Sequence, residues 1–592
     1  MRTDARQSVG CLPTMGPPRS RKRHCDLTRE NSLRHVLPRV PDQSSDKEEP
    51  WYNVPSLSFC PNQRLVASIK LKQAQIGRRT TRTASNMWTL ETPNPTMSLR
   101  DYLVLAAVGI AAYSLLRTIY LVWFHPLAKF PGPKIAAVSN VWYGYQWLSG
   151  RYPWAMQTAF ERYGDVVRIA PNELVFITPK AYADIYTSTI NGRPAFVKSD
   201  LLDTGDKYEG LASERDIDKH RAARKQLAPA FSPRSLKQYE PAIHAHVDGF
   251  VAELRNSPAV GDGVDIAPWF ERATCDLGGS ITLGHNFKNI QSGQNHPILE
   301  SLLRIGHWAT FRNVMRRFPL LYPLSYVLLP PKVALSYFRA HSTSKALIRT
   351  RVRERHDRKE LDYMTQFLKN EAAIPPDDFL VAQAGHLILD HYESSSVLTA
   401  GLCFLTKNDE VMAKLQTELR TAFKSYDDIS DDKLQGLPWL AATIEEVIRL
   451  HTNVPYGLPR ISPGYTVDGH HVAKNVVVSS CAYATTHSEA YFSKPYEFKP
   501  QRWLPKDHPD YDGVFDNDDK AAFRPFSAGS RNCLGQAMAY VVLRIMFAKL
   551  VWSFKWDLLN KDEMDWDRDL RLYIVWQKPK VHVRVTPFEN KV

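Results

Sequence analysis

Residues 526–535 read FSAGSRNCLG and place one cysteine, Cys533, in a short loop directly before an apolar run. Gly529 allows the loop to turn tightly, Arg531 puts a fixed positive charge two residues before the sulfur, and Gly535 allows close backbone approach just after it. The run that follows, QAMAYVVLRIMFAKL, has apolar residues at helical spacing. We therefore expect Cys533 near a helix N-terminus, where free amides and the helix dipole favour a thiolate. A single thiolate leaves the other positions of a bound metal open.

The loop carries the complete pattern Phe-x-x-Gly-x-Arg-x-Cys-x-Gly, which begins at Phe526. A lone cysteine before a helix is more often a small buried residue than a ligand. The full pattern, however, resembles the haem-binding loop of the cytochrome P-450 superfamily, in which a cysteine thiolate is the proximal iron ligand. The resemblance implies that Cys533 binds the iron of haem b, and that Phe526, Gly529, Arg531 and Gly535 shape the cofactor-binding loop.

Length and cysteine content fit one large domain with terminal extensions. A chain of 592 residues with 44% hydrophobic residues can build a large core. Its seven cysteines form no C-x-x-C motif or Cys/His pair, which argues against zinc modules, iron–sulfur clusters and a disulfide framework.

The formal net charge of +14 is concentrated near the N-terminus. Residues 1–96 contain 16 Lys or Arg and 8 Asp or Glu, so they supply more than half of this charge. They also contain scattered proline and serine and no sustained hydrophobic period, which predicts a disordered basic extension rather than a nucleic-acid-binding module. Because Met97 opens MSLRDYLVL directly before an apolar segment, we interpret residues 1–96 as an upstream extension of the gene model.

Residues 97–124 are predicted to form a single membrane anchor. The run 102–124, YLVLAAVGIAAYSLLRTIYLVWF, is almost wholly apolar, and at ~1.5 Å per residue a helix of this length crosses the ~30 Å hydrocarbon layer. Arg117 lies near the end of the run, where its side chain reaches the surface, and Trp123 suits the interface. A buried core helix is the alternative. Residues 125–134, HPLAKFPGPK, read as a proline-rich hinge similar to that of microsomal members of the superfamily.

Residues 163–186 alternate apolar and polar residues around a Pro-Asn turn and predict a β-hairpin followed by a short helix.

Basic residues in two later segments match cofactor-binding positions of the superfamily. Residues 220–232 then predict a helix that places His220 and Arg224 on one face. The resemblance implies that Arg224, with His220 in place of a commoner tryptophan, and Arg460 bind the haem carboxylates together with Arg531. Solvent-exposed charges on a basic helix are the alternative for His220 and Arg224.

Residues 382–408 predict a long, proline-free central helix that contains an acid beside hydroxyls. In the superfamily this helix crosses the oxygen-binding face of the haem with a pattern resembling Ala-Gly-x-Glu/Asp-Thr-Thr, and the matching residues here read DHYESS. Glu393 and Ser394 match the acid–alcohol pair, which implies a role in proton delivery during oxygen activation. Asp390 and His391 replace the small Ala-Gly pair. We predict that His391 restricts or tunes oxygen handling rather than ligating iron; a hydrogen-bonded structural cluster is the alternative.

Two further segments predict a scaffold behind the cofactor. Residues 437–455 predict an amphipathic helix with Glu446 and Arg449 three residues apart, close enough for an ion pair. About fifty residues later, FKPQRW resembles the Phe-x-Pro-x-Arg-Phe/Trp segment of the superfamily. The resemblance implies that Arg502 completes a buried Glu–Arg–Arg network with a structural role.

Taken together, these segments resemble the cytochrome P-450 superfamily over residues 97–592. The implied fold is mainly α with a small β region, the triangular prism of the superfamily, preceded by one transmembrane helix. We expect a membrane anchor at 97–124, a hinge at 125–134 and the haem-thiolate catalytic domain at 135–592. Haem b would lie between the helix that carries Glu393 and the helix that follows Cys533.

The resemblance implies a monooxygenase that oxidises a lipophilic small molecule, with a terpenoid or polyketide of secondary metabolism as the expected substrate class. NADPH-cytochrome P-450 reductase would supply electrons, with cytochrome b5 as a second candidate donor. The expected location is the endoplasmic reticulum membrane, with the catalytic domain in the cytoplasm. Because of DHYESS, a haem-thiolate isomerase, dehydratase or peroxygenase remains the alternative. A haem sensor or nucleic-acid-binding protein is disfavoured, since neither needs the full set of motifs.

Overall fold

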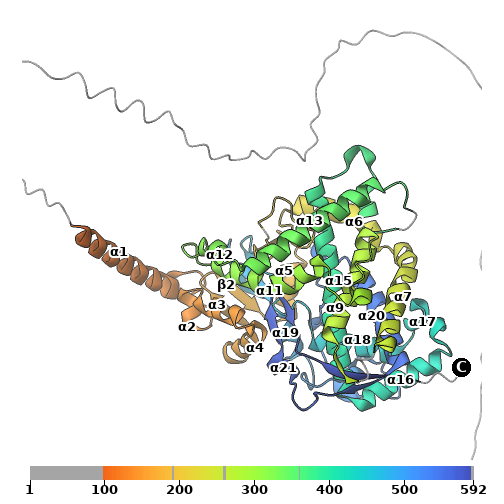
Figure 1. The fold of residues 1–592 in the computed structure, drawn as a ribbon. Helices are drawn as coiled ribbons and strands as arrows, with labels where there is room; N and C mark the ends of the chain where they lie inside the picture. Colours follow the sequence, from red (N-terminus) through yellow and green to blue (C-terminus); the bar gives the residue numbers. More distant parts are fainter. Residues whose placement is uncertain (1–97, 190–191, 204, 258–261, 359–360, 589–592) are drawn as a thin grey trace, which may run out of the picture. The chain divides into compact units, whose positions relative to one another are not determined.

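The computed structural model describes residues 98–189, 192–203, 205–257, 262–358 and 361–588. The predicted basic extension, residues 1–96, and Met97 lie outside these residues. The described part is mainly helical with short strands, as expected, and its helices surround the long central helix α15 (Asp377–Thr406; Figure 1).

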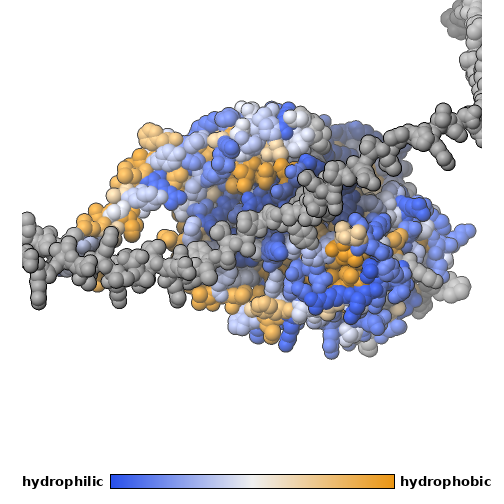
Figure 2. Space-filling view, turned by 90° about the horizontal axis from the view of Figure 1, so that it is seen from above, coloured by the Kyte–Doolittle hydropathy of each residue, from blue (hydrophilic) through white to orange (hydrophobic). Residues whose placement is uncertain are grey.

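Helix α1 (Leu99–Ile119) continues into a π-helical turn, η1 (Tyr120–Phe124), over the predicted anchor. It begins after Ser98, which forms a capping box with Asp101: the Ser98 amide donates to the Asp101 carboxylate at 2.9 Å and the Asp101 amide to the Ser98 hydroxyl at 3.3 Å. No residue of α1 is buried. Figure 2 shows many hydrophobic (orange) residues at the left, where Figure 1 places α1. The span Leu99–Phe124 is long and apolar enough to cross a membrane.

The proline-rich segment 125–134 packs onto the protein. Leu127 and Phe130 are buried in a small apolar cluster beside the first strands. The amide of Arg168 donates to the carbonyl oxygen of Pro131 at 2.8 Å. A side chain at Gly132 would overlap the carbonyl oxygen of Arg168, so only glycine fits this close approach. The segment predicted as a hinge is therefore held against strand β1 (Val166–Ala170).

Twelve helices lie between α1 and α15 in the described part of the chain. They are α2 (Lys134–Val138), α3 (Val141–Leu148), α4 (Tyr152–Tyr163), α5 (Pro179–Tyr186), α6 (Ile217–Leu227), α7 (Pro233–Asn256), α9 (Ala267–Leu283), α10 (Asn289–Ser292), α11 (Pro297–Arg316), α12 (Leu324–Val327), α13 (Pro331–Arg353) and α14 (Met364–Leu368). After α15 come α16 (Asp409–Ala422), α17 (Asp431–Leu434), α18 (Pro438–Leu450), α19 (Ala482–Thr486), α20 (Gln536–Ser553) and α21 (Trp566–Asp569).

A five-stranded sheet has the order β1-β2-β8-β5-β3. Its members after β1 are β2 (Glu173–Phe176), β3 (Val197–Lys198), β5 (Arg460–Ile461) and β8 (Val477–Ser480). The predicted hairpin is confirmed, because β1 pairs antiparallel with β2 and α5 follows. Strand β3 pairs with β5 so that Lys198 lies opposite Arg460.

Smaller sheets complete the β region. They comprise β6 (Tyr465–Val467) with β7 (His470–Val472), β10 (Arg571–Tyr573) with β11 (Val575–Gln577), and β4 (Val264–Asp265), β12 (His582–Pro587) and β9 (Phe554–Leu558) in the order β4-β12-β9.

The core is organised around α15, which packs along α9 and also contacts α13, α18 and α20. The segment contains no proline, and Asp377 and Asp378 lie in the first turn, where carboxylates interact favourably with the helix dipole. Tertiary packing supports its length, because most of its residues are buried. Helix α20 matches the length and composition of a membrane span, but most of its apolar window is buried inside the protein. It is therefore a core helix; the apolar spacing had predicted a helix at this place.

Candidate active site

The loop that carries Cys533 is shaped by its backbone. It contains a 3-10 turn, η8 (Gly529–Arg531), and leads into α20. Gly529 has φ +79°, and a side chain there would overlap the carbonyl oxygen of Tyr186. The amide of Cys533 donates to the carbonyl oxygen of Phe526 at 2.8 Å, which closes the loop. A side chain at Gly535 would lie 3.9 Å from the sulfur. These contacts fix the position of the thiol.

The Cys533 thiol faces an internal space. The thiol has accessible surface although it lies deep in the protein. Burial is the main cause that raises its pKa to about 12, and the nearby Asp390 raises it further. The amides of Gly535 and Gln536 and the guanidinium of Arg224 act in the opposite direction. The expected helix N-terminal stabilisation of a thiolate is thus present, but burial outweighs it until a cation binds the sulfur. No group of three or more His, Cys, Asp or Glu that could hold a bare metal ion occurs among the described residues.

Cations gather around this space. Arg224 donates to the backbone oxygen and side-chain oxygen of Asn532, both at 2.7 Å. Arg460 donates to the carbonyl oxygen of Leu458 at 2.9 Å, and Arg531 donates to the backbone oxygens of residues 214–216. In the described part of the chain, Arg224, Arg460 and Arg531 form no ion pair with a carboxylate. Arg224 acts on the Cys533 thiol, and Arg460 acts on Arg531; their binding of the haem carboxylates stays a prediction.

His220 and Lys198 belong to the same group of cations. Burial, with Arg531 next in importance, lowers the pKa of His220 to about 3, so this buried imidazole is neutral. Burial also lowers the pKa of Lys198 well below its ordinary value, with Arg460 and Arg531 adding to the shift. Lys198 bonds to the backbone oxygen of Ala212. No sequence motif indicates Lys198; its position opposite Arg460 in the sheet reveals it.

This set of donors fits the expected cofactor. Cations shielded from water are stable only when anions or oriented dipoles compensate them. Among the described residues, the hydrogen bonds that Arg224, Arg460, Arg531 and Lys198 donate all go to uncharged oxygens. A haem with two carboxylates, bound through Cys533, would supply the missing anions. Arg224, Arg460, Arg531 and Lys198 would then hold the haem carboxylates, and Cys533 the iron.

On the other side of this space, α15 presents Asp390. Its side chain is exposed, although burial raises its pKa to about 7 against the opposing effect of Lys198. Asp390 also raises the pKa of Cys533, so both side chains face the same internal space. Among the described residues none donates a hydrogen bond to its carboxylate.

His391 does not face this space, contrary to its predicted role in oxygen handling. Its side chain is buried, with the ring stacked on that of Tyr363 and Nε2 lying 3.4 Å from the Tyr363 hydroxyl. A side chain at Gly278 of α9 would lie 2.9 Å from its Cβ. Burial lowers the pKa of His391 to about 4. The physical reason is the helical rotation of about 100° per residue, which turns Asp390 toward the space and His391 toward α9.

Glu393 and Ser394 are partly accessible, one turn after Asp390. Burial raises the pKa of Glu393 to about 7, while Lys578 opposes the rise and Asp390 adds to it. The next two hydroxyls serve the scaffold: Ser395 accepts a hydrogen bond from Lys578 at 3.2 Å, and Ser396 lies 2.7 Å from Nε2 of a buried histidine, His451. Glu393 and Ser394 therefore remain available to a ligand.

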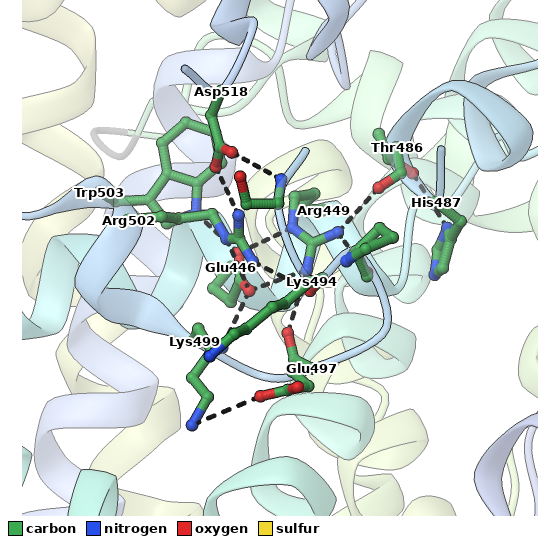
Figure 3. A network of polar contacts seen from close by, with 12 residues as sticks. Glu446, Arg449, Thr486, His487, Lys494, Glu497, Lys499, Arg502, Trp503 and Asp518 are labelled. Carbon is green, nitrogen blue, oxygen red and sulfur yellow. Dashed lines mark hydrogen bonds and ion pairs between the residues drawn. The ribbon is translucent and has the colours of Figure 1, made fainter. Parts of the chain in front are cut away.

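Behind the cysteine loop, Glu446 holds the predicted network of arginines (Figure 3). Arg449 donates twice to its carboxylate at 2.8 Å, and Arg502 donates at 3.1 Å. All three side chains are fully buried. Burial raises the pKa of Glu446, but the two arginines outweigh this effect, so the net direction is downward.

Two members of this network were not predicted. The indole of Trp503 donates to Glu446 at 2.9 Å, and Asp518 pairs with Arg502. Trp503 stands beside Arg502 in the FKPQRW motif and was identifiable from it. Asp518 lies in a 3-10-rich stretch without a motif, so only the fold reveals it.

Comparison with known proteins identifies the family. The family model "Cytochrome P450" matches residues 131–585. The chain is 36% identical over 479 residues to cytochrome P450 monooxygenase poxC of Penicillium oxalicum, covering 81% of this chain and 93% of that protein. It is 34% identical over 496 residues to cytochrome P450 monooxygenase TwmD of Talaromyces wortmannii, covering 83% and 97%. The chain therefore belongs to the cytochrome P450 family of monooxygenases, whose haem iron is held by a cysteine thiolate.

Proposed function

We propose that this protein is a haem b monooxygenase that oxidises a lipophilic small molecule of secondary metabolism, a terpenoid or polyketide. The observation that supports it most is the set of residues around one internal space: Cys533, the accessible Glu393 and Ser394 of α15, and the cations Arg224, Arg460, Arg531 and Lys198, which form no carboxylate ion pair in the described part of the chain. The relatives named above are fungal P450 monooxygenases, which supports the proposed reaction class.

The protein residues have separate roles in this proposal. Haem iron, when bound through Cys533, supplies the chemistry of oxygen activation. Glu393, whose pKa burial raises to about 7, is protonated in a large fraction of molecules near neutral pH and donates a proton, and the hydroxyl of Ser394 orients it toward the space beside Asp390. Buried apolar residues of α9 and α15 exclude bulk water, so the proton reaches the site through these groups.

Electrons would come from NADPH-cytochrome P-450 reductase. Arg531 faces inward, toward backbone oxygens, and so does not form the docking surface. Lys219, Arg221 and Lys225 on α6 are exposed, on the helix that also carries Arg224. A basic surface of this kind suits an acidic reductase face.

Attachment to the endoplasmic reticulum membrane would use two surfaces. The first is the apolar span Leu99–Phe124. The second is an apolar surface at α12 and the start of α13, where Leu320 is 96%, Val327 79% and Phe338 67% exposed. Exposed apolar surface of this extent is typical of a membrane contact.

Expression from Met97 with a P450 reductase tests the proposal. Membranes with the protein should give the ferrous–CO spectrum of a thiolate-bound haem, and supplied NADPH should yield metabolites with one oxygen atom from labelled dioxygen. Cys533→Ala should lose both signals at equal protein level, whereas Asp378→Ala, at the distant start of α15, should keep them. Products that form equally well without NADPH would instead favour the isomerase, dehydratase or peroxygenase alternative.

A further inference from the structure

Asp390 occupies a place in the active site that no role yet explains. The apolar neighbours of this residue on α15, Leu387 and Ile388, are buried, whereas Asp390 is accessible from the same internal space as the thiol of Cys533. It projects from a rigid helix that packs along α9 on its other side. Its carboxylate therefore occupies a fixed position opposite the cysteine.

The carboxylate has no hydrogen-bond donor from the described residues. Lys198 acts on it electrostatically, but the ammonium group of Lys198 is bonded to the backbone oxygen of Ala212. A desolvated carboxylate without donors is costly, and a donor supplied by a ligand removes that cost. The free acceptor oxygens of Asp390 thus point to a ligand with a hydrogen-bond donor.

The proposed substrate class favours a hydroxyl group as this donor. Terpenoids and polyketides carry hydroxyl groups as their usual hydrogen-bond donors and are rarely cationic. Lys198, whose charge acts on Asp390, is assigned above to a haem carboxylate and is bonded elsewhere, so it does not supply the donor. The rest of the accessible wall of α15 near Asp390 offers one further acid and one hydroxyl, Glu393 and Ser394.

We propose that Asp390 is a specificity-determining residue that accepts a hydrogen bond from a hydroxyl group of the substrate, so that the enzyme acts on an already hydroxylated lipophilic molecule. This inference rests on the proposed monooxygenase function and names the substrate class of the same site. The enzyme would then act on the product of an earlier reaction that introduces or exposes a hydroxyl group. The hydroxyl would orient the molecule and decide which carbon faces the haem.

Binding of a matched pair of probes tests the proposal. Dissociation constants of 1-adamantanol and adamantane would be measured on the ferric haem-loaded protein at pH 8, from the Soret difference spectrum and by equilibrium dialysis. A hydrogen bond to a carboxylate corresponds to about a tenfold or larger preference for the alcohol. Asp390→Ala should remove this preference without weakening adamantane, and Asp390→Asn should retain part of it.

Asp378→Ala is the matched control. Asp378 is on the same helix, exposed and paired with Lys345 at 2.6 Å, so its loss should leave the preference unchanged. Equal affinity of the wild-type protein for the two probes, including no measurable binding of either, would overturn the proposal. So would an alcohol preference that survives in Asp390→Ala with normal haem content. A missing thiolate–haem spectrum in the wild-type protein would instead overturn the proposed function itself.

Discussion

Glu393 has a carboxyl group that its surroundings keep protonated. Burial raises its pKa to about 7, and Asp390 one turn earlier adds to the rise. A neutral carboxyl group beside Ser394 can donate a proton at the pH of the cell, whereas an ordinary surface glutamate cannot. The same shift makes the folded protein less stable when the pH rises.

The sign follows from proton binding. Between the ordinary pKa of Glu393, 4.5, and about 7, the folded state binds more protons than the unfolded state, so stability falls as the pH rises through this window. Glu393→Gln should therefore raise the melting temperature at pH 8, by the equivalent of ~1–2 kcal/mol for this partly accessible group, and leave it nearly unchanged at pH 4. Thermal melts of haem-loaded protein at both pH values measure this, with Asp378→Asn as control. An equal gain at both pH values would contradict the assigned shift.

Asp390 and His391 illustrate what the sequence predicted at this scale. Their replacement of two small residues was visible in DHYESS, but which of them reaches the site was not. Helix α15 has apolar residues on all sides, so no polar stripe indicates its orientation. Only packing against Gly278 and Tyr363 decides that His391 is turned away.

At the scale of elements, the Glu446 network joins α18 to the segment that precedes the cysteine loop. The backbone amide of Lys499 donates to the Glu446 carboxylate at 3.0 Å. The guanidinium of Arg449 donates to the backbone oxygens of Thr486 and Pro495 at 2.8 and 2.7 Å. Glu446 and Arg449 thus join α18 to the end of α19 and to the segment before the 3-10 turn Pro500–Trp503. This scaffold precedes the cysteine loop in the chain, which is why we expect it to support the position of Cys533.

Glu446→Ala should prevent haem incorporation before it alters ligand preference. Removal of the carboxylate leaves two buried guanidinium groups without their partner, at a cost of roughly 3–5 kcal/mol. Haem per polypeptide, measured by pyridine haemochrome, should fall to a small fraction of the wild-type value. Glu410→Ala, an exposed glutamate at the start of α16, should behave like the wild type. A normal haem content in Glu446→Ala would contradict the structural role.

Some helices and strands could be predicted from the sequence and others could not. The hairpin of β1 and β2, α15, α18 and α20 follow from local periodicity and were expected. The pairing of β3 with β5 joins residues about 260 positions apart through two-residue strands, too short for any periodic pattern. Lys198 escaped prediction for that reason.

On the scale of the whole protein, the described chain has two exposed apolar surfaces, on α1 and around α12. The second surface contains Leu320, Val327 and Phe338 and no residue of the anchor. Membrane attachment by two independent surfaces would be stronger than by either, because binding of one raises the effective concentration of the other.

Deletion of residues 1–124 should therefore release only part of the protein from membranes. The further changes Leu320→Glu and Val327→Glu should release most of the rest, since a charge is costly in the apolar layer. Sedimentation with lipid vesicles, at equal haem content, measures the bound fraction; Val514→Glu, at another exposed apolar residue, serves as control. Complete release by the deletion alone would contradict a second membrane surface.

The cations around Cys533 also affect how the protein matures in the cell. Arg460 and Arg531 act on Lys198, Arg224 is bonded to the cysteine loop, and like charges that share a partly desolvated region repel one another. A newly made chain carries this repulsion until a dianionic cofactor neutralises it, and binding then stabilises the folded state. Cofactor supply thereby becomes a checkpoint in biosynthesis: cells starved of haem should degrade this chain rather than store it as apoprotein.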